Sequence, residues 1–322
     1  MARDHGGNLD QAIRLYGGDP AAWIDLSTGI NRVPYPVGTL PPEVWTALPT
    51  RSAMAALLEA ARTAYRTTAP IVALSGAQGA IQLVPLLARG RARILAPTYN
   101  EHAAALRSAG WSVQDVTSLT DLAGADLAVV VNPNNPDGQH HSRADLLALV
   151  PKVGRLLVDE SFADPVPEQS LAADAGRPGL IVLRSFGKFY GLAGLRLGFA
   201  LGEQTDIDRL TVLAGPWPVA GAAIELGRRA LRDADWTAET TQRLVADVAR
   251  LDDMAMKVGW QLIGGTALFR TYATPDATSA QTQLARQQIW SRIFPSSLHW
   301  IRLGLPGTPQ EWARLASACK VE

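Results

Sequence analysis

The chain has 322 residues with 30 basic and 30 acidic side chains, so its formal net charge is zero. Zero net charge argues against a broad nucleic-acid-binding surface, which needs a basic stripe. With 47% hydrophobic and 19% charged residues, wholesale disorder is excluded, and the single Cys319 excludes an internal disulfide framework.

The N-terminal segment 1–8 is polar and carries no apolar signal region. No apolar run approaches the roughly 18–20 residues of a membrane span. We therefore expect a soluble cytoplasmic protein. At roughly 150 residues per domain, the length predicts about two domains.

Residues 1–45 are rich in Gly and Pro, and we expect them to be irregular. Short apolar runs, rich in Val, Ile and Leu, follow near 71–74, 93–96, 126–131, 155–158, 180–184 and 196–201. Helix-like segments lie between several of them, near 78–88, 101–109 and 142–150. Continuous apolar runs are typical of strands buried on both faces. The alternation predicts an α/β fold with a mainly parallel central sheet between helices.

The last third of the chain has a different pattern. A long helical pattern covers 219–257, and strands are expected at 267–272 and 300–303, as in a smaller α+β unit. We predict a large domain over 46–220 and a small domain built from 1–45 and 221–322.

The strongest local signal, Ser-Phe-Gly-Lys-Phe-Tyr-Gly-Leu-Ala-Gly-Leu-Arg-Leu-Gly-Phe, begins at Ser185. Its Lys188 is one of only four lysines beside 26 arginines, and no acid follows within eight residues. Lys188 could be a surface residue on a Gly-rich loop. Apolar surroundings, however, favour the neutral amine and make it a candidate to bond covalently with a carbonyl. Ser185 and Arg196, on either side, are residue types that bind phosphate.

This segment resembles the cofactor-lysine motif of fold-type I pyridoxal-phosphate enzymes, the class I/II aminotransferase family. The resemblance implies the fold-type I architecture and pyridoxal 5'-phosphate as cofactor. It also implies that Lys188 is catalytic and carries the cofactor, and that Ser185 and Arg196 bind the cofactor phosphate.

Two strand ends carry further parts of the resemblance. Residues 132–138, Asn-Pro-Asn-Asn-Pro-Asp-Gly, predict a turn and resemble the segment in which Asn135 would bond the phenolic oxygen of the cofactor. Residues 156–162, Leu-Leu-Val-Asp-Glu-Ser-Phe, place Asp159 where the family pairs a carboxylate with the pyridine nitrogen. That carboxylate keeps the ring protonated as an electron sink. By itself, Asp159 also fits a plain strand-end charge.

The segment 75–80, Ser-Gly-Ala-Gln-Gly-Ala, separates a strand from a helix-like run. Small residues let amides at a helix N-terminus approach a phosphate, although many strand-to-helix turns are Gly-rich. In register with the family, Gly76, Ala77 and Gln78 would contact the cofactor phosphate. Tyr99 would be the catalytic-site aromatic that stacks on the pyridine ring, unless it is an ordinary half-buried tyrosine.

Substrate-binding residues are implied near both chain ends. Arg302, in Trp-Ile-Arg-Leu-Gly, resembles the arginine that binds the substrate α-carboxylate. Gly29 and Asn31 lie in a segment resembling the substrate-side loop, and Arg292 matches a position used for phosphate-bearing substrates. Further phosphate-binding candidates are His5, Asn8 and Arg32.

At four places, the sequence resembles one branch of the family, the threonine-phosphate decarboxylases of cobalamin biosynthesis. These places are 5–8, 25–31, 265–269 and Phe162. Many relatives, including histidinol-phosphate aminotransferases, carry tyrosine at the position of Phe162. The implied reaction is decarboxylation of L-threonine O-3-phosphate to (R)-1-amino-2-propanol O-2-phosphate.

Two alternatives stay open. One is an aminotransferase acting on a phosphorylated substrate such as histidinol phosphate, against which Phe162 and Leu48 argue. The other is a non-catalytic binding protein, against which the retained site residues argue. The family implies a homodimer, although Leu48 replaces a tyrosine that reaches the partner subunit's cofactor phosphate. A complex with another cobalamin-pathway enzyme would be tested by co-purification.

No metal site is expected. The pair His140-His141 follows the turn at 132–138 without Cys or acids at ligand spacing, so a surface position is favoured over a metal site.

Overall fold

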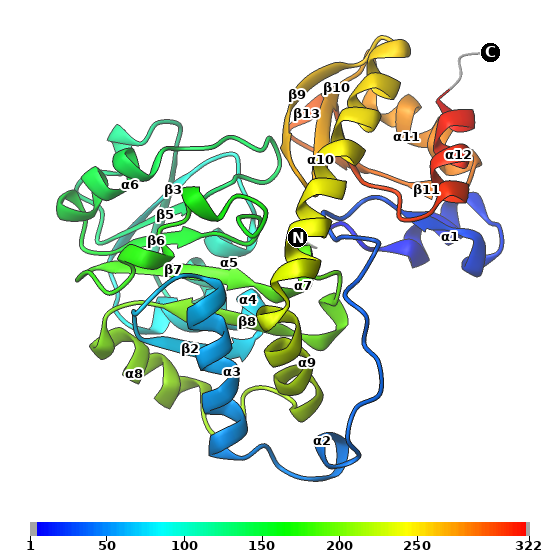
Figure 1. The fold of residues 1–322 in the computed structure, drawn as a ribbon. Helices are drawn as coiled ribbons and strands as arrows, with labels where there is room; N and C mark the ends of the chain where they lie inside the picture. Colours follow the sequence, from blue (N-terminus) through cyan, green and yellow to red (C-terminus); the bar gives the residue numbers. More distant parts are fainter. Residues whose placement is uncertain (1–4, 320–322) are drawn as a thin grey trace. The chain divides into compact units, whose positions relative to one another are not determined.

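The computed structural model describes residues 5–319 and separates them into two units (Figure 1). The central unit comprises residues 35–135 and 139–237. The terminal unit comprises 5–34, 136–138 and 238–319 and so includes both described chain ends. The main boundaries between the units follow residues 34 and 237, whereas the sequence predicted domain boundaries after residues 45 and 220.

A seven-stranded sheet forms the middle of the central unit, in the order β2-β8-β7-β6-β5-β3-β4. Only β8 runs antiparallel to its neighbours. The strands are β2 (Ile71–Ser75), β3 (Arg91–Leu95), β4 (Ser112–Val116), β5 (Leu127–Val131), β6 (Leu156–Asp159), β7 (Leu180–Ser185) and β8 (Leu197–Leu201). Each predicted apolar run is a strand. The edge strand β4 was missed because its half-exposed Ser-Val-Gln-Asp-Val sequence lacks an apolar run.

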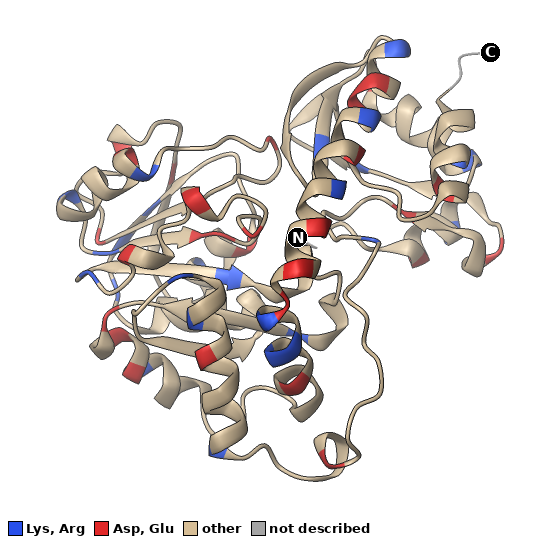
Figure 2. Ribbon diagram, viewed as in Figure 1, with Lys and Arg blue, Asp and Glu red and all other residues tan. Residues whose placement is uncertain are grey.

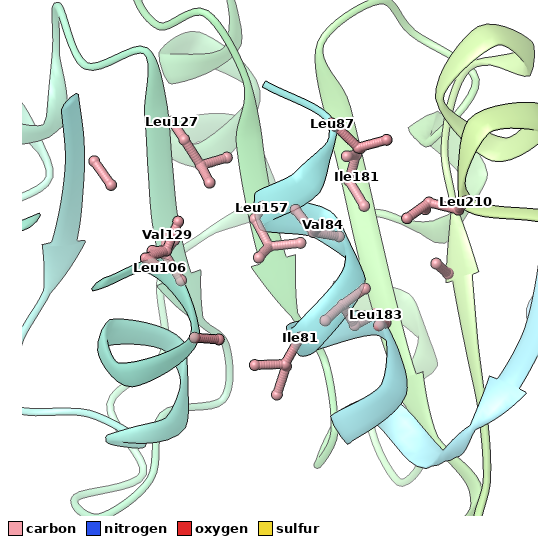
Figure 3. Close-up of a cluster of buried hydrophobic side chains, with 14 of the residues drawn as sticks. Ile81, Val84, Leu87, Leu106, Leu127, Val129, Leu157, Ile181, Leu183 and Leu210 are labelled. Carbon is pink, nitrogen blue, oxygen red and sulfur yellow. The ribbon is translucent and has the colours of Figure 1, made fainter. Parts of the chain in front are cut away.

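Helices surround this sheet (Figure 1). They are α2 (Glu43–Thr46), α3 (Arg51–Ala64), α4 (Gly76–Leu83), α5 (Glu101–Ser108), α6 (Arg143–Leu149), α7 (Phe186–Phe189), α8 (Gln204–Ala214) and α9 (Gly221–Arg232). Ile81 of α4 is buried in one core cluster with Leu157 and Leu183 of the sheet (Figure 3). Burial of each such side chain contributes about 1.5–3 kcal/mol.

The other face of the sheet holds a buried ion cluster. Arg184 of β7 donates to Glu160 (2.8 Å) and Asp164 (2.5 Å), and its guanidinium lies 4.4 Å from the ring centroid of Tyr65. Because side chains alternate along a strand, Glu160 and Arg184 point away from the face that carries their neighbours Asp159 and Ser185.

The predicted single helical pattern over 219–257 is two helices, α9 and α10 (Ala234–Lys257). They separate at Asp233, whose φ of −89° and ψ of 83° are not helical. Its Oδ1 accepts from the amide of Trp236 (3.0 Å), as an N-capping side chain does. A capping aspartate therefore ends one helix and starts the next.

The terminal unit contains an antiparallel sheet in the order β12-β13-β10-β9. Its strands are β9 (Gln261–Thr266), β10 (Phe269–Ala273), β12 (Arg292–Phe294) and β13 (Ser297–Gly304), and its other helices are α11 (Ala277–Arg286) and α12 (Pro309–Ala318). A short parallel pair, β1 (Ile24–Asp25) with β11 (Ile289–Trp290), joins the N-terminal segment to the C-terminal part.

The expectation that residues 1–45 are irregular is wrong at α1 (Leu9–Tyr16). Asn8 caps this helix by accepting from the amide of Gln11 (3.2 Å). Its apolar side chains, spaced for one helix face, pack against a cluster of Trp23, Ala285 and Trp290.

Acidic and basic residues are interspersed over the described part of the chain (Figure 2). Among the described helices, none combines the length and the apolar character needed to cross a bilayer.

Candidate active site

A cavity in the central unit opens where β5, β6 and β7 end and α4 begins. It is lined by all nine residues predicted to bind the cofactor: Gly76, Ala77, Gln78, Tyr99, Asn135, Asp159, Ser185, Lys188 and Arg196. The carboxyl ends of parallel strands are a common place for ligand sites in α/β folds. The structure thus brings together segments that are more than one hundred residues apart in sequence.

One wall of the cavity is the start of α4. Gly76 has a φ of +73°, and a Cβ atom there would lie 3.0 Å from Nη2 of Arg196. At Gly198, a Cβ atom would lie 2.3 Å from the amide nitrogen of Ala77. The side chain of Ser75 does not cap the helix, so the first amides of α4 remain available to an anion.

Arg196 stands at the edge of this helix start, in the left-handed conformation (φ 53°). Within residues 5–319 its guanidinium pairs with no carboxylate, and its hydrogen bond goes to the carbonyl of Ala193 (3.2 Å). A helix N-terminus beside an arginine without a carboxylate partner is a site for a phosphate group.

Asp159 ends β6 with only 2% of its surface exposed. His102 Nε2 lies 2.9 Å from Oδ2, and the amide and hydroxyl of Ser161 donate to Oδ1 (3.0 and 2.5 Å). Burial would raise the pKa of this carboxyl, but the hydrogen bonds of His102 and Ser161 lower it below its ordinary value. Asp159 is therefore ionised at neutral pH. A carboxylate must be ionised to pair with the protonated pyridine nitrogen of the expected cofactor.

His102 was missed in the sequence. It lies on α5 and is 1% exposed, and its ring meets the ring of Tyr99 edge-on at 6.2 Å. The side chain of Gln78 joins the same group, since its Nε2 donates to Glu101 (3.1 Å) and its Oε1 lies 3.4 Å from the hydroxyl of Tyr99. A histidine in a helical stretch of sequence does not by itself indicate a functional site. Its contact with the buried carboxylate of Asp159 does indicate one, but this contact can be seen only in the tertiary structure.

Lys188 lies in α7, the single turn after β7. Its Nζ is 5.6 Å from the ring centroid of Phe162, which is 5% exposed and offers no hydroxyl to the site. The ring of Tyr190, the residue that follows α7, stacks on the rings of Phe186 and Trp236, with centroid distances of 4.4 and 5.5 Å. This stacking holds the short turn that carries Lys188.

The predicted substrate residues lie in the terminal unit. Arg302 is 6% exposed and donates through Nη2 to the carbonyl of Ser27 (2.5 Å). Its cross-strand neighbour is Arg292. Burial and the charge of Arg292 lower the pKa of Arg302 to about 9, although the charge of Asp25 acts in the opposite direction. An anion beside the pair would further reduce the cost of the two positive charges.

The other candidates have different surroundings. Asn31 is buried, and its Oδ1 accepts from Nη2 of Arg243 (2.8 Å). Arg32, which was predicted to bind the substrate phosphate, forms a bidentate ion pair with Glu311. Asn8 caps α1 through its side chain. Gly29 is buried in the loop after β1, and His5 is exposed at the start of the described chain.

The family model named Aminotransferase class I and II matches residues 45–319. A threonine-phosphate decarboxylase of Pseudomonas aeruginosa is 44% identical, covering 98% of this chain and 96% of that protein. Another, from Sinorhizobium, is 39% identical, with 98% and 96% covered. Histidinol-phosphate aminotransferase of Sinorhizobium meliloti, solved with pyridoxal-5'-phosphate, matches with a TM-score of 0.80 at 20% identity, with 99% and 94% covered.

The chain therefore belongs to the class I and II aminotransferase family. The predicted family, fold class and pyridoxal 5'-phosphate cofactor are confirmed. The residues present also fit this cofactor, because an anion-binding helix start, an ionised buried carboxylate and a lysine line one cavity.

Proposed function

We propose that this protein decarboxylates L-threonine O-3-phosphate to (R)-1-amino-2-propanol O-2-phosphate in cobalamin biosynthesis. The observation that carries the proposal is the 44% identity to a threonine-phosphate decarboxylase over nearly the whole chain. A buried phenylalanine at position 162, in place of the tyrosine of many aminotransferases, supports the same reading.

The central unit would hold the cofactor through the residues of its cavity. Lys188 would bond to it covalently, Asp159 would pair with the ring nitrogen, Tyr99 would stack on the ring and Asn135 would bond the phenolic oxygen. Its phosphate would be bound by Gly76, Ala77, Gln78, Ser185 and Arg196. When bound, pyridoxal phosphate supplies an electron sink for the pair released at the substrate α-carbon.

The terminal unit would supply the substrate-binding groups. We assign the α-carboxylate to Arg302 and the substrate phosphate to Arg292, because forked guanidinium donors match both anions. In the reaction the bond between Cα and the carboxylate breaks and carbon dioxide leaves. The amine of Lys188, freed when the substrate amine takes its place, or a water that it binds, would then return a proton to Cα.

The test is incubation of the purified protein and pyridoxal phosphate with threonine phosphate in the absence of a keto acid. Stoichiometric carbon dioxide and aminopropanol phosphate are expected. Product formation only with a keto acid, from histidinol phosphate, would instead establish the aminotransferase alternative.

We also propose that the protein is a cytoplasmic homodimer. The central unit exposes large apolar side chains on and beside α2, with Trp45 68% and Leu48 65% exposed, and a second copy would cover them. Light scattering should give twice the chain mass of 34.4 kDa.

A further inference from the structure

One aromatic ring contacts both arginines of the terminal unit. The ring centroid of Phe294 lies 5.5 Å from Cζ of Arg292 and 5.8 Å from Cζ of Arg302. Arg302 also lies over a second ring, with its Cζ 5.0 Å from the centroid of Phe269. The two guanidinium groups thus share one phenyl ring, and Arg302 contacts a second ring as well.

Strand register brings Arg292, Arg302 and Phe269 together. Arg292 of β12 is directly opposite Arg302 of β13, and Arg302 is in turn opposite Thr271 of β10. Because side chains alternate along each strand, positions two residues away share the same face. Phe269 precedes Thr271 by two positions, so its ring lies on the face that carries Arg302. The pairing of β12 with β13 is irregular between Ile293 and Phe294, so the position of the Phe294 ring follows from its distances to the two guanidinium groups and not from strand register.

A ring suits this position for a physical reason. Like charges at opposed cross-strand positions repel each other. The charge of Asp25 offsets part of the cost at Arg302, but a carboxylate placed directly between the two arginines would neutralise both cations. The negative face of a phenyl ring attracts a guanidinium within about 6 Å and leaves its full charge and its hydrogen-bond donors in place.

We propose that Phe294 is a specificity-determining residue: its ring holds Arg292 and Arg302 at a set separation, so that substrates with two anionic groups are preferred over amino acids with a carboxylate alone. This inference rests on the proposed function, which assigns the phosphate to Arg292 and the carboxylate to Arg302. It adds that the aromatic ring, as well as the two charges, sets the preference.

The test compares the holoenzyme with Phe294→Leu and Phe294→Met, which keep apolar bulk without a ring, and with Phe294→Tyr, which keeps the ring. For each we would measure kcat and KM with threonine phosphate, competitive inhibition by inorganic phosphate, and the Kd of unphosphorylated L-threonine from the cofactor absorbance. Unchanged melting temperatures would show that each variant is folded.

In the ring-less variants, KM for threonine phosphate and the inhibition constant of phosphate should rise about 3- to 30-fold, the range of a lost cation–π contact. The Kd of L-threonine and kcat should change little, because Arg302 keeps its contact with the ring of Phe269, and Phe294→Tyr should match the parent protein. If the parent prefers threonine phosphate and the ring-less variants keep that preference, the inference is overturned and the proposed function stands. If the parent shows no preference, the proposed substrate itself is wrong, and the inference is overturned with it.

Discussion

Arg292 and Arg302 occupy directly opposed positions on the neighbouring strands β12 and β13, ten residues apart in sequence. A hairpin normally places opposite charges or apolar side chains at such a pair, because opposed like charges destabilise it. Arg302 is moreover buried, which makes its charge costly in the free protein. An anion bound beside the pair would lower both costs, which supports the substrate-binding role proposed for these two arginines.

Replacement of Arg302 by alanine should weaken substrate binding far more than cofactor binding. Loss of charge-assisted hydrogen bonds to a carboxylate lowers affinity by about 10- to 100-fold. Titration of the holoenzyme with threonine phosphate, followed by cofactor absorbance, measures the effect. Arg286→Ala, at an exposed arginine of α11, is the matched control. Equal losses of substrate and cofactor affinity would contradict the role assigned to Arg302.

Replacement of Lys188 by alanine should abolish both the visible absorbance of lysine-bound cofactor and turnover, because no other described lysine lines the cavity. Absorption spectra and carbon dioxide release measure the two effects. Lys257→Ala, at an exposed lysine near the end of α10, should leave both unchanged. A Lys188→Ala protein with normal turnover would refute the assignment.

Replacement of Gly76 by alanine should lower cofactor affinity about tenfold, which corresponds to a loss of about 1.4 kcal/mol. The added Cβ would lie 3.0 Å from the Arg196 guanidinium, in a backbone conformation with φ +73° that alanine adopts at a cost. Gly124→Ala is the control, since its φ is +79° but nothing lies within 4 Å of the added atom. Equilibrium dialysis of pyridoxal phosphate should therefore separate the two variants, although both lose thermal stability.

Replacement of His102 by leucine should destabilise the protein by about 1–3 kcal/mol at pH 7, because it leaves an oxygen of Asp159 buried without its partner. The pKa of Asp159 is lowered in the folded state, so the stability it contributes is present above its unfolded value of 3.8 and is lost as the pH falls below that value. Denaturant unfolding of parent and variant should thus differ most near neutral pH and converge in acid. A difference independent of pH would exclude the ionised carboxylate as its source.

Much of the central unit could be predicted because short apolar runs report buried strands directly. Strands β2, β5, β6 and β7 lie within one or two residues of the predicted runs, and the residues that follow them are the candidate site residues. The antiparallel direction of β8 could not be predicted, because a buried strand has the same apolar pattern in either direction. The helix α1 was missed because its neighbouring glycines and prolines masked an apolar face of only two turns.

The sequence by itself determined the family and predicted which loops would bind the cofactor, since each candidate is next to a strand end or turn whose local pattern is encoded within a few residues. Tertiary structure alone decided which side chains face each other over long separations. His102 contacts Asp159, which is 57 residues away in the sequence. Arg32, which was expected to bind phosphate, pairs with Glu311, which is 279 residues away. The physical reason is that a charged side chain binds whichever partner the fold brings within hydrogen-bond distance, and strand order and register set that partner.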